Sequence, residues 1–153
     1  MKPEEASHWM GEALAYARRA RELGEVPVGA VIVRGGEQLG AGCNLRETKG
    51  DPLAHAEMEA IVDARNRVEG WRFEGCEMVV TLEPCAMCAG ALVNGRFAGL
   101  VFGARDPKAG FCGSLGDLVR EPRLNHRLEV ESGVRAQEIS ALLKGFFADL
   151  RRE

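Results

Sequence analysis

Hydrophobic positions along the 153-residue chain follow either the 3.6-residue period of an amphipathic helix or the short apolar runs typical of strands. The helical period is clear near both ends, over residues 4–23 and 135–150. Between these two segments, apolar or β-rich stretches predict strands at residues 28–33, 39–43, 77–82, 99–103 and around 127–130. The pattern therefore predicts a sheet enclosed by terminal helices.

Two further helices are predicted next to prolines, at residues 54–68 and 85–94. Pro52 ends the loop before the first of them, and Pro84 precedes the second, because proline suits a first helical turn and blocks an earlier start. Strands that alternate with helices predict an α/β fold in three α/β/α layers, with a central five-stranded mixed sheet flanked by helices. The strand at 99–103 is apolar throughout, which predicts a buried, parallel strand. Residues 44–53 are predicted as a loop, and one helical turn is predicted at residues 115–119 within the irregular segment 104–125.

Length and composition are those of one ordinary globular domain, residues 1–153, with 46% hydrophobic and 28% charged residues. No apolar run approaches the roughly 18 residues of a membrane span, and the N-terminus lacks the apolar core of a signal peptide, so we expect no membrane association. The five cysteines are an odd number without evident disulfide pairing, which favours a reducing, cytoplasmic location.

The net charge of −3 bears on nucleic-acid binding. Proteins that coat a nucleic acid usually carry a basic surface, so the acidic balance argues against this class. An enzyme that takes a few loop bases into a pocket needs fewer phosphate contacts, and this class stays open.

Metal-ligand spacing is the strongest chemical signal in the chain. Cys85 and Cys88 are three residues apart, so on a helix they share a face, and His55 lies 30 positions upstream. Both ligand sets are predicted at helix N-termini, where the helix dipole favours thiolates. Three protein ligands leave one tetrahedral position open to water, which is the pattern of a catalytic zinc site.

Glu57 is the candidate general base. Residues two apart in a helix point about 200° away from each other, so His55 and Glu57 serve one centre only if His55 reaches over the helix end. A zinc ion with two thiolate ligands lowers the pKa of its bound water less than one with three histidine ligands would, so a local base is needed to take the proton. The alternative for Glu57 is an exposed helical glutamate, and Glu59 serves as the comparison.

His55, Cys85 and Cys88 also have plainer interpretations. In one alternative, the three residues are a buried histidine and two inert core cysteines. In the others, the two cysteines form a redox pair or half of a structural zinc site. The chain has no second C-x-x-C motif, which argues against the structural site. His126 is a candidate fourth ligand, but a fourth ligand would close the catalytic position, so a turn histidine with local hydrogen bonds is the favoured interpretation.

The H-x-E and P-C-x-x-C motifs together are the signature of zinc nucleobase deaminases. On them the chain resembles the cytidine/deoxycytidylate deaminase superfamily and, within it, the bacterial tRNA-specific adenosine deaminases. The resemblance spans nearly the whole chain. Its segments are EVPVGAV (25–31), CN (43–44), HAE (55–57), TLEPCAMCAGA (81–91), VFGARD (101–106), NHR (125–127) and FF (146–147).

The resemblance implies a cytidine deaminase-like fold, one Zn²⁺ per subunit held by His55, Cys85 and Cys88, and a homodimer. It implies hydrolytic deamination of adenosine to inosine at the wobble position of a tRNA anticodon loop, with Glu57 carrying protons to ring N1 and then to the departing amine. Three alternatives stay open. They are a deaminase of guanine, cytosine or a free nucleoside in the same superfamily, a non-catalytic RNA-binding module stabilised by zinc, and a purely structural zinc protein.

The same resemblance implies substrate contacts by Val28, Asn44, Asp106 and Phe147, with Lys108 as a weaker candidate for a phosphate contact. Three of these residues have a plainer interpretation: Asn44 ends a strand, Asp106 caps a loop before Pro107, and Phe147 lies on the apolar stripe of its helix, which favours a place in the core. Phe146 and Phe147 are adjacent, so they cannot point the same way on a helix, and one of them is a candidate platform for an unpaired base. Residues 107–112 are bulkier than the small-residue loop of the family pattern, a departure that bears on contacts with RNA and leaves the metal site unchanged.

Overall fold

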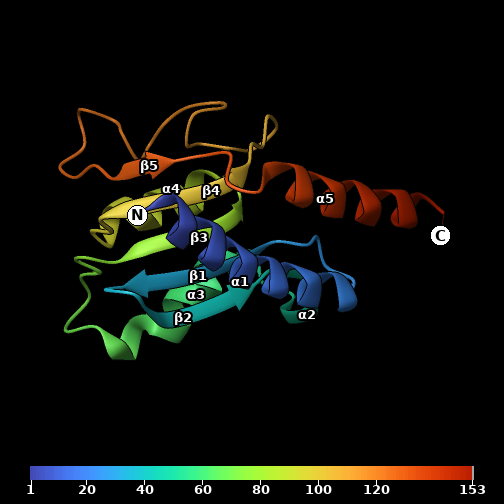
Figure 1. The fold of residues 1–153 in the computed structure, drawn as a ribbon, viewed down its shortest axis with the longest axis horizontal. Coiled ribbons are helices and arrows are strands. Elements are labelled where there is room, and N and C mark those ends of the chain that lie inside the picture. Colours follow the sequence, from blue (N-terminus) through green and yellow to red (C-terminus); the bar gives the residue numbers. More distant parts are fainter. Residues whose placement is uncertain (153) are drawn as a thin grey trace.

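The computed structural model describes residues 1–152, so Glu153, the last position of the predicted domain, lies outside the described part. The centre of the molecule is one five-stranded sheet with the strand order β2-β1-β3-β4-β5 (Figure 1). The strands are β1 Gly29–Arg34, β2 Glu37–Cys43, β3 Glu77–Leu82, β4 Gly99–Ala104 and β5 Glu129–Glu131. The predicted strands are therefore confirmed, with bounds that shift by at most two residues.

The sheet is mixed, as predicted. β1 pairs antiparallel with β2 and with β3, whereas β3, β4 and β5 run parallel. Parallel neighbours need a crossover connection. The helix α4 (Ala86–Asn94) supplies the crossover from β3 to β4, and the irregular segment 105–128 leads from β4 to β5.

Helices cover both faces of the sheet, which gives the predicted three layers (Figure 1). Val31, Val79 and Val101 pack with α1 (Pro3–Glu22) and α5 (Ala136–Arg151) on one face. The residues next to them in each strand point to the other face, because side chains alternate along a strand, and they pack with α3 (Ala56–Ala64) and α4. The two helices that carry the candidate metal ligands therefore share one face.

Two glycines of β2 let α3 lie directly on the sheet. A Cβ atom at Gly40 would lie 2.7 Å from the Cβ of Ala64, and one at Gly42 would lie 2.7 Å from the backbone nitrogen of Ala60. Such distances are shorter than any real carbon contact, so a side chain at either position would push the helix away. The close approach fixes the start of α3, where the histidine and glutamate of the H-x-E motif lie.

Three local predictions are corrected by the structure. Residues 46–49, predicted as loop, form the short helix α2 (Arg46–Lys49), whose first backbone amides are bound by the distant carboxylate of Glu25. The helix predicted over residues 54–68 is α3, followed by a 3-10 turn at Arg65–Arg67. The helical turn expected near residues 115–119 is absent from the described chain, and Cys112 instead forms an isolated β-bridge with Asp117.

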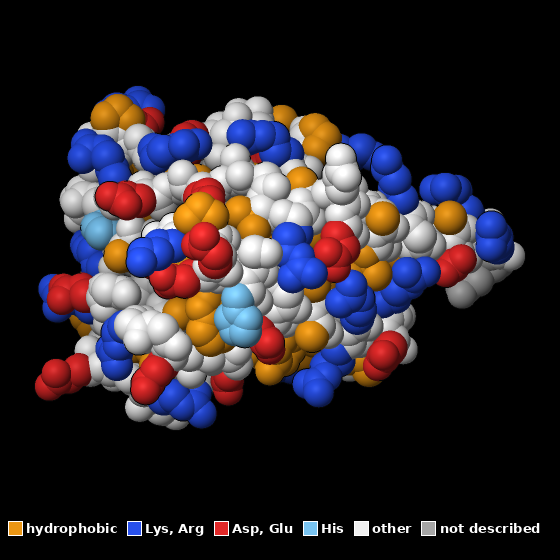
Figure 2. Space-filling view, viewed as in Figure 1, with side chains coloured by type: hydrophobic (Ala, Val, Ile, Leu, Met, Phe, Trp, Pro, Cys, Tyr) orange, Lys and Arg blue, Asp and Glu red, His pale blue; other side chains and the backbone are white. Residues whose placement is uncertain are grey.

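The C-terminal half of α5 extends past the body of the molecule, beside the end of α1 (Figure 1). Ion pairs join the two helices: Arg18 contacts Glu138 at 3.1 Å, and Arg21 contacts Asp149 at 2.7 Å. On the face that Figure 2 shows, basic side chains gather toward this projecting end, and both charges are mixed elsewhere. Among residues 1–152, no helix combines the length and apolar character that crossing a bilayer requires.

Candidate active site

The three predicted metal ligands come together at the starts of two helices. His55 is the residue immediately before α3, Cys85 is the residue immediately before α4, and Cys88 lies in the first turn of α4. The Nδ1 atom of His55 lies 3.5 Å from the sulfur of Cys85 and 3.7 Å from that of Cys88. All three ligand atoms lie within 4.8 Å of one another. His55 thus stands at the helix end, as its spacing from Glu57 required.

These distances fit a tetrahedral zinc ion. Zinc binds imidazole nitrogen at about 2.0 Å and thiolate sulfur at about 2.3 Å, so a nitrogen and a sulfur on the same ion lie roughly 3.6 Å apart. The two observed separations from His55 lie on either side of this value. Within residues 1–152 no other group of three such side chains is close enough to share an ion. His126 is not a fourth ligand, because its Nε2 bonds to the carbonyl oxygen of Phe97 at 2.7 Å.

The charges of the two sulfurs also call for a cation. Contact with Cys88, together with His55, lowers the pKa of Cys85 to about 4, so Cys85 is a thiolate at neutral pH. Contact with Cys85, followed by burial, raises the pKa of Cys88. The two sulfurs thus compete for one proton, and a bound divalent cation removes this conflict by stabilising both as thiolates.

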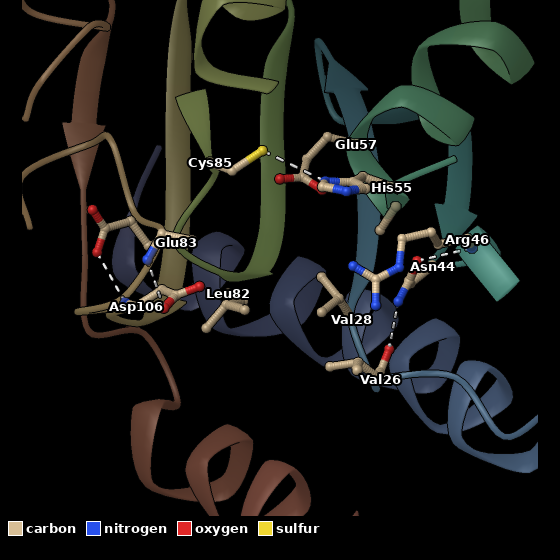
Figure 3. Close-up of a pocket in the computed structure, with 12 residues that line it drawn as sticks. Val26, Val28, Asn44, Arg46, His55, Glu57, Leu82, Glu83, Cys85 and Asp106 are labelled. Atoms are coloured by element: carbon tan, nitrogen blue, oxygen red, sulfur yellow. Dashed lines mark hydrogen bonds between the residues drawn. The ribbon is translucent and has the colours of Figure 1, made fainter. Parts of the chain in front are cut away.

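Glu57 is buried beside the ligands, with 4% of its surface exposed. Figure 3 shows its carboxylate directed toward the space between His55 and Cys85. Burial raises the pKa of Glu57 to about 7, and the positive charge of a bound cation would act to lower it. Glu59, the comparison residue, instead forms an ion pair with Lys49.

A pocket of about 200 Å³ opens at this cluster. Drug-sized ligands occupy sites of roughly 300–1,000 Å³, so this volume suits a single base-sized group. One wall, which we call the loop wall, consists of Leu82, Glu83, Asp106 and Ala109, and the opposite wall, the hairpin wall, consists of Val26, Val28, Asn44 and Arg46 (Figure 3). The floor between the walls carries His55, Ala56, Glu57 and Cys85.

The structure places the predicted substrate residues in two groups. Val28, Asn44 and Asp106 line the pocket. Lys108 and Phe147 do not: Lys108 is exposed two residues beyond Asp106, and Phe147 is 41% exposed on α5. Its neighbour Phe146 is 9% exposed and belongs to the core, which decides which of the two adjacent rings faces outward.

Asn44 and Asp106 each combine a pocket position with a local structural contact. The Asn44 side chain donates to the carbonyl oxygen of Val26 and accepts from the backbone amide of Arg46. Asp106 Oδ1 accepts from the backbone amides of Lys108 and Ala109, at 3.1 and 3.2 Å. The plainer interpretations of Asn44 and Asp106 are therefore real features of the fold, and they hold both residues at the pocket.

Six pocket residues were not predicted as site residues: Val26, Arg46, Ala56, Leu82, Glu83 and Ala109. Each adjoins or lies close to a predicted site residue or motif in the sequence, which was the available signal. Glu83 is the most informative of them, since it lies inside the TLEPC segment and is only 2% exposed. Burial by itself would raise the pKa of Glu83, but hydrogen bonds from Ser114 and three backbone amides outweigh it, and the pKa lies below its ordinary value.

Glu25 has the same character on the other side of the pocket. It is 2% exposed and accepts hydrogen bonds from the backbone amides of Glu47 and Thr48 and from the Thr48 hydroxyl, at 3.2, 2.6 and 2.7 Å. Burial opposes its ionisation, but these hydrogen bonds prevail and lower the pKa of Glu25. The carboxylate thereby fixes α2 and with it the pocket residue Arg46.

Comparison with known proteins identifies the family. Residues 3–104 match the family described as cytidine and deoxycytidylate deaminase zinc-binding region, and this segment contains all three predicted ligands. The tRNA-specific adenosine deaminase of Bacillus subtilis is 49% identical over 145 residues, covering 95% of this chain and 90% of that protein. The protein of the same name from Haemophilus influenzae is 44% identical over 145 residues, covering 94% and 84%.

Solved structures show the same fold. One from a study of A-to-I editing by tRNA:A34 deaminases at the wobble position superposes with a TM-score of 0.84 at 38% identity, covering 88% of this chain and 98% of that one. The guanine deaminase from Nitrosomonas europaea superposes with a TM-score of 0.79 at 24% identity, covering 93% and 84%, a likeness of fold alone. The chain belongs to the zinc-dependent cytidine and deoxycytidylate deaminase family, as a relative of the bacterial tRNA-specific adenosine deaminases.

Proposed function

We propose that this protein is a zinc-dependent tRNA adenosine deaminase that converts adenosine to inosine at the wobble position of an anticodon loop. The observation that carries the proposal is the buried Glu57 beside a His-Cys-Cys cluster on the floor of a base-sized pocket. The choice of substrate rests on the relatives named above, because proteins named tRNA-specific adenosine deaminase match over nearly the whole chain.

In this proposal His55, Cys85 and Cys88 hold one zinc ion per subunit. Zinc, when bound, supplies a water molecule of lowered pKa and positive charge that stabilises developing negative charge on oxygen. The chain supplies the geometry: two helix N-termini direct their positive ends at the thiolates, and three ligands leave one position for solvent.

Glu57 moves the protons. Its carboxylate accepts a proton from the attacking water and delivers it to ring N1, which makes C6 electrophilic. It then takes the second proton from the hydroxyl group added at C6 and transfers it to the amino group, so that the C6–N bond breaks, ammonia leaves, and the oxygen of water stays on C6 as the carbonyl of inosine. Burial keeps bulk water from this carboxylate and so preserves its proton for the substrate.

The pocket walls recognise the base and its ribose. Val28 and Leu82 offer apolar surface to the flat faces of the base, while Asn44 and Asp106 offer polar groups on opposite sides. Phe147 is exposed outside the pocket and provides a stacking platform for a neighbouring unpaired base. Exposed Lys108 is placed to meet an RNA phosphate.

A homodimer and a cytoplasmic location complete the proposal. The outward face of α4 carries small residues, with Ala86 exposed and Gly90 and Ala91 partly exposed, which permits close approach of a second subunit. All five cysteines are free in the structure, which agrees with a reducing compartment.

The decisive experiment compares substrates. An anticodon stem-loop with adenosine at the wobble position, guanine and cytidine are each incubated with the zinc-loaded protein. Inosine in the digested RNA and ammonia release are measured. We expect inosine from the stem-loop and no ammonia from the small molecules. Ammonia from guanine or cytidine without inosine in the RNA would instead make the protein a small-molecule deaminase, which its acidic net charge favours.

A further inference from the structure

Glu83 is a buried carboxylate whose oxygens are both bound to one irregular loop. Its Oε1 accepts from the backbone amide of Asp106 at 3.0 Å and from the Ser114 hydroxyl. Its Oε2 accepts from the backbone amides of Cys112 and Ser114, each at 3.0 Å. Among residues 1–152 no lysine or arginine forms an ion pair with it. The negative charge is therefore balanced by loop N–H and O–H groups alone.

The loop, residues 106–114, closes tightly around this carboxylate. A Cβ atom at Gly110 would lie 2.3 Å from Cδ of Glu83, so only glycine fits there. Gly110 forms an isolated β-bridge with Cys85, and the amide of Phe111 donates to the carbonyl oxygen of Pro84 at 2.9 Å. The loop is thus attached to the segment that carries a metal ligand.

The hydrogen bonds to Glu83 hold part of the loop wall in place. Asp106 and Ala109 belong to that wall, yet residues 106–114 contain no helix or strand of their own. Buried hydrogen bonds to a charged group are worth more than neutral ones, so Glu83 is the strongest polar restraint on this loop. Figure 3 shows Glu83 bound to Asp106 at the side of the pocket, away from the floor.

We propose that Glu83 is a positioning residue, which holds residues 106–114 so that Asp106 stays at the pocket edge at a fixed distance from the metal ligands. This inference rests on the proposed deaminase function for its kinetic consequence only. Glu83 acts on substrate binding through Asp106 and takes no part in the proton transfers. In this proposal zinc binding and the chemical step depend on the floor residues and Cys88, and not on Glu83.

Glu83→Gln is the discriminating variant. A glutamine has one acceptor oxygen, which can replace Oε2 and keep the amides of Cys112 and Ser114. Its NH₂ group then faces the amide of Asp106, donor against donor, while the Ser114 hydroxyl can rotate to accept. The substitution therefore releases the Asp106 end of the loop and leaves the other end bound.

Single-turnover deamination of the stem-loop separates the effects, with zinc content measured beside it. For Glu83→Gln we expect one zinc per chain and a saturated rate within about threefold of that of the unmodified protein. The half-saturating stem-loop concentration should rise about tenfold, because the loss of one buried hydrogen bond costs about 1.4 kcal/mol. In Asp106→Ala, adding Glu83→Gln should cause no further loss, because both act through one contact. Ser114→Ala should give a smaller change of the same kind.

Asp63→Asn is the matched control, since Asp63 also accepts from a backbone amide, that of Ala41 at 2.9 Å, and does not line the pocket. We expect it to leave the half-saturating concentration unchanged. Losses that add fully in the Glu83→Gln, Asp106→Ala double variant would overturn the proposal, as would lost zinc or a slowed saturated rate with unchanged affinity. Hydrogen exchange of residues 106–114 tests positioning without any substrate. Faster exchange there in Glu83→Gln supports it even if the unmodified protein makes no inosine, and unchanged exchange refutes it.

Discussion

The His55 Nδ1 atom lies 3.5 Å from the Cys85 sulfur, although 30 residues separate them in the chain. Each residue immediately precedes a helix, α3 for His55 and α4 for Cys85, and both helices pack on the same face of the sheet. The fold thus builds the metal site by bringing two helix N-termini together.

Removing a ligand should remove the metal. We expect the purified protein to contain about one zinc per chain and Cys88→Ala to contain almost none, with no detectable inosine formation. Metal that binds only the folded state stabilises that state, so removing zinc with a chelator should lower the melting temperature. Free zinc at 100–1,000 times its Kd stabilises the folded state by about 3–4 kcal/mol. Elemental analysis and thermal melts provide the measurements. Cys76 is buried outside the cluster, so the control variant Cys76→Ala should keep its zinc. Zinc retained in Cys88→Ala would refute the ligand assignment.

Replacing the proposed proton carrier should separate chemistry from metal binding. Glu57→Gln keeps the size of the side chain but removes the carboxylate, so we expect normal zinc content and a single-turnover rate lower by about 10²–10⁴-fold or more. Glu59→Gln, which breaks only the pair with Lys49, should stay within a few-fold of the unmodified protein. A Glu57→Gln rate close to normal would exclude the role.

Local spacing was enough to predict the His-Cys-Cys cluster and most of the sheet. The i, i+3 cysteines, the prolines before two helices and the apolar runs are all short-range signals, and each strand appeared within two residues of its predicted bounds. Helix α2 could not be found in this way. Four residues make too short a helix to be stable alone, and it forms because Glu25, some twenty positions away, binds its first amides.

The pocket walls were harder to predict than its floor for the same reason. In the sequence Glu83 lies beside the P-C-x-x-C motif, but its hydrogen-bond partners lie 23–31 residues later in the chain. The Phe146-Phe147 pair shows a second limit, since the helical period cannot tell which of two adjacent rings is buried where a helix extends beyond the body. The structure gives Phe146 to the core and exposes Phe147.

Acid should cancel the contribution of Glu25. Its folded-state pKa is lowered, so its stabilising effect is complete above the unfolded pKa of about 4.3 and is lost as pH falls through the lower folded value. We expect Glu25→Gln to cost about 1.5–3 kcal/mol at pH 7, because hydrogen bonds to a charged group are lost, and the difference from the unmodified protein to shrink as the pH falls below the unfolded pKa of about 4.3. Denaturant unfolding at several pH values measures it. A gap that widens on acidification would contradict the assignment.

The two adjacent phenylalanines should respond oppositely. Phe146→Ala removes a core ring and should lower the free energy of unfolding by about 3 kcal/mol. Phe147→Ala should leave stability within about 0.5 kcal/mol but weaken stem-loop binding by the roughly 1–3 kcal/mol of one base–aromatic stack. Leu150→Ala, at another exposed apolar position of α5, is the control and should change neither quantity. Unchanged RNA affinity in Phe147→Ala would remove Phe147 from the substrate contacts.

The proposed dimer can be tested at Gly90 because a side chain there meets nothing within its own subunit. A Cβ atom at this position of α4 has no neighbour within 4 Å, and arginine is a better helix former than glycine by about 0.5–1 kcal/mol, so Gly90→Arg should fold at least as well as the unmodified subunit. If a second subunit packs against this face, the arginine has no room. Light scattering should then report about twice 16.6 kDa for the unmodified protein and for Gly90→Ala, and a single subunit for Gly90→Arg. A Gly90→Arg dimer would place the interface elsewhere, and a monomeric unmodified protein would end the dimer proposal.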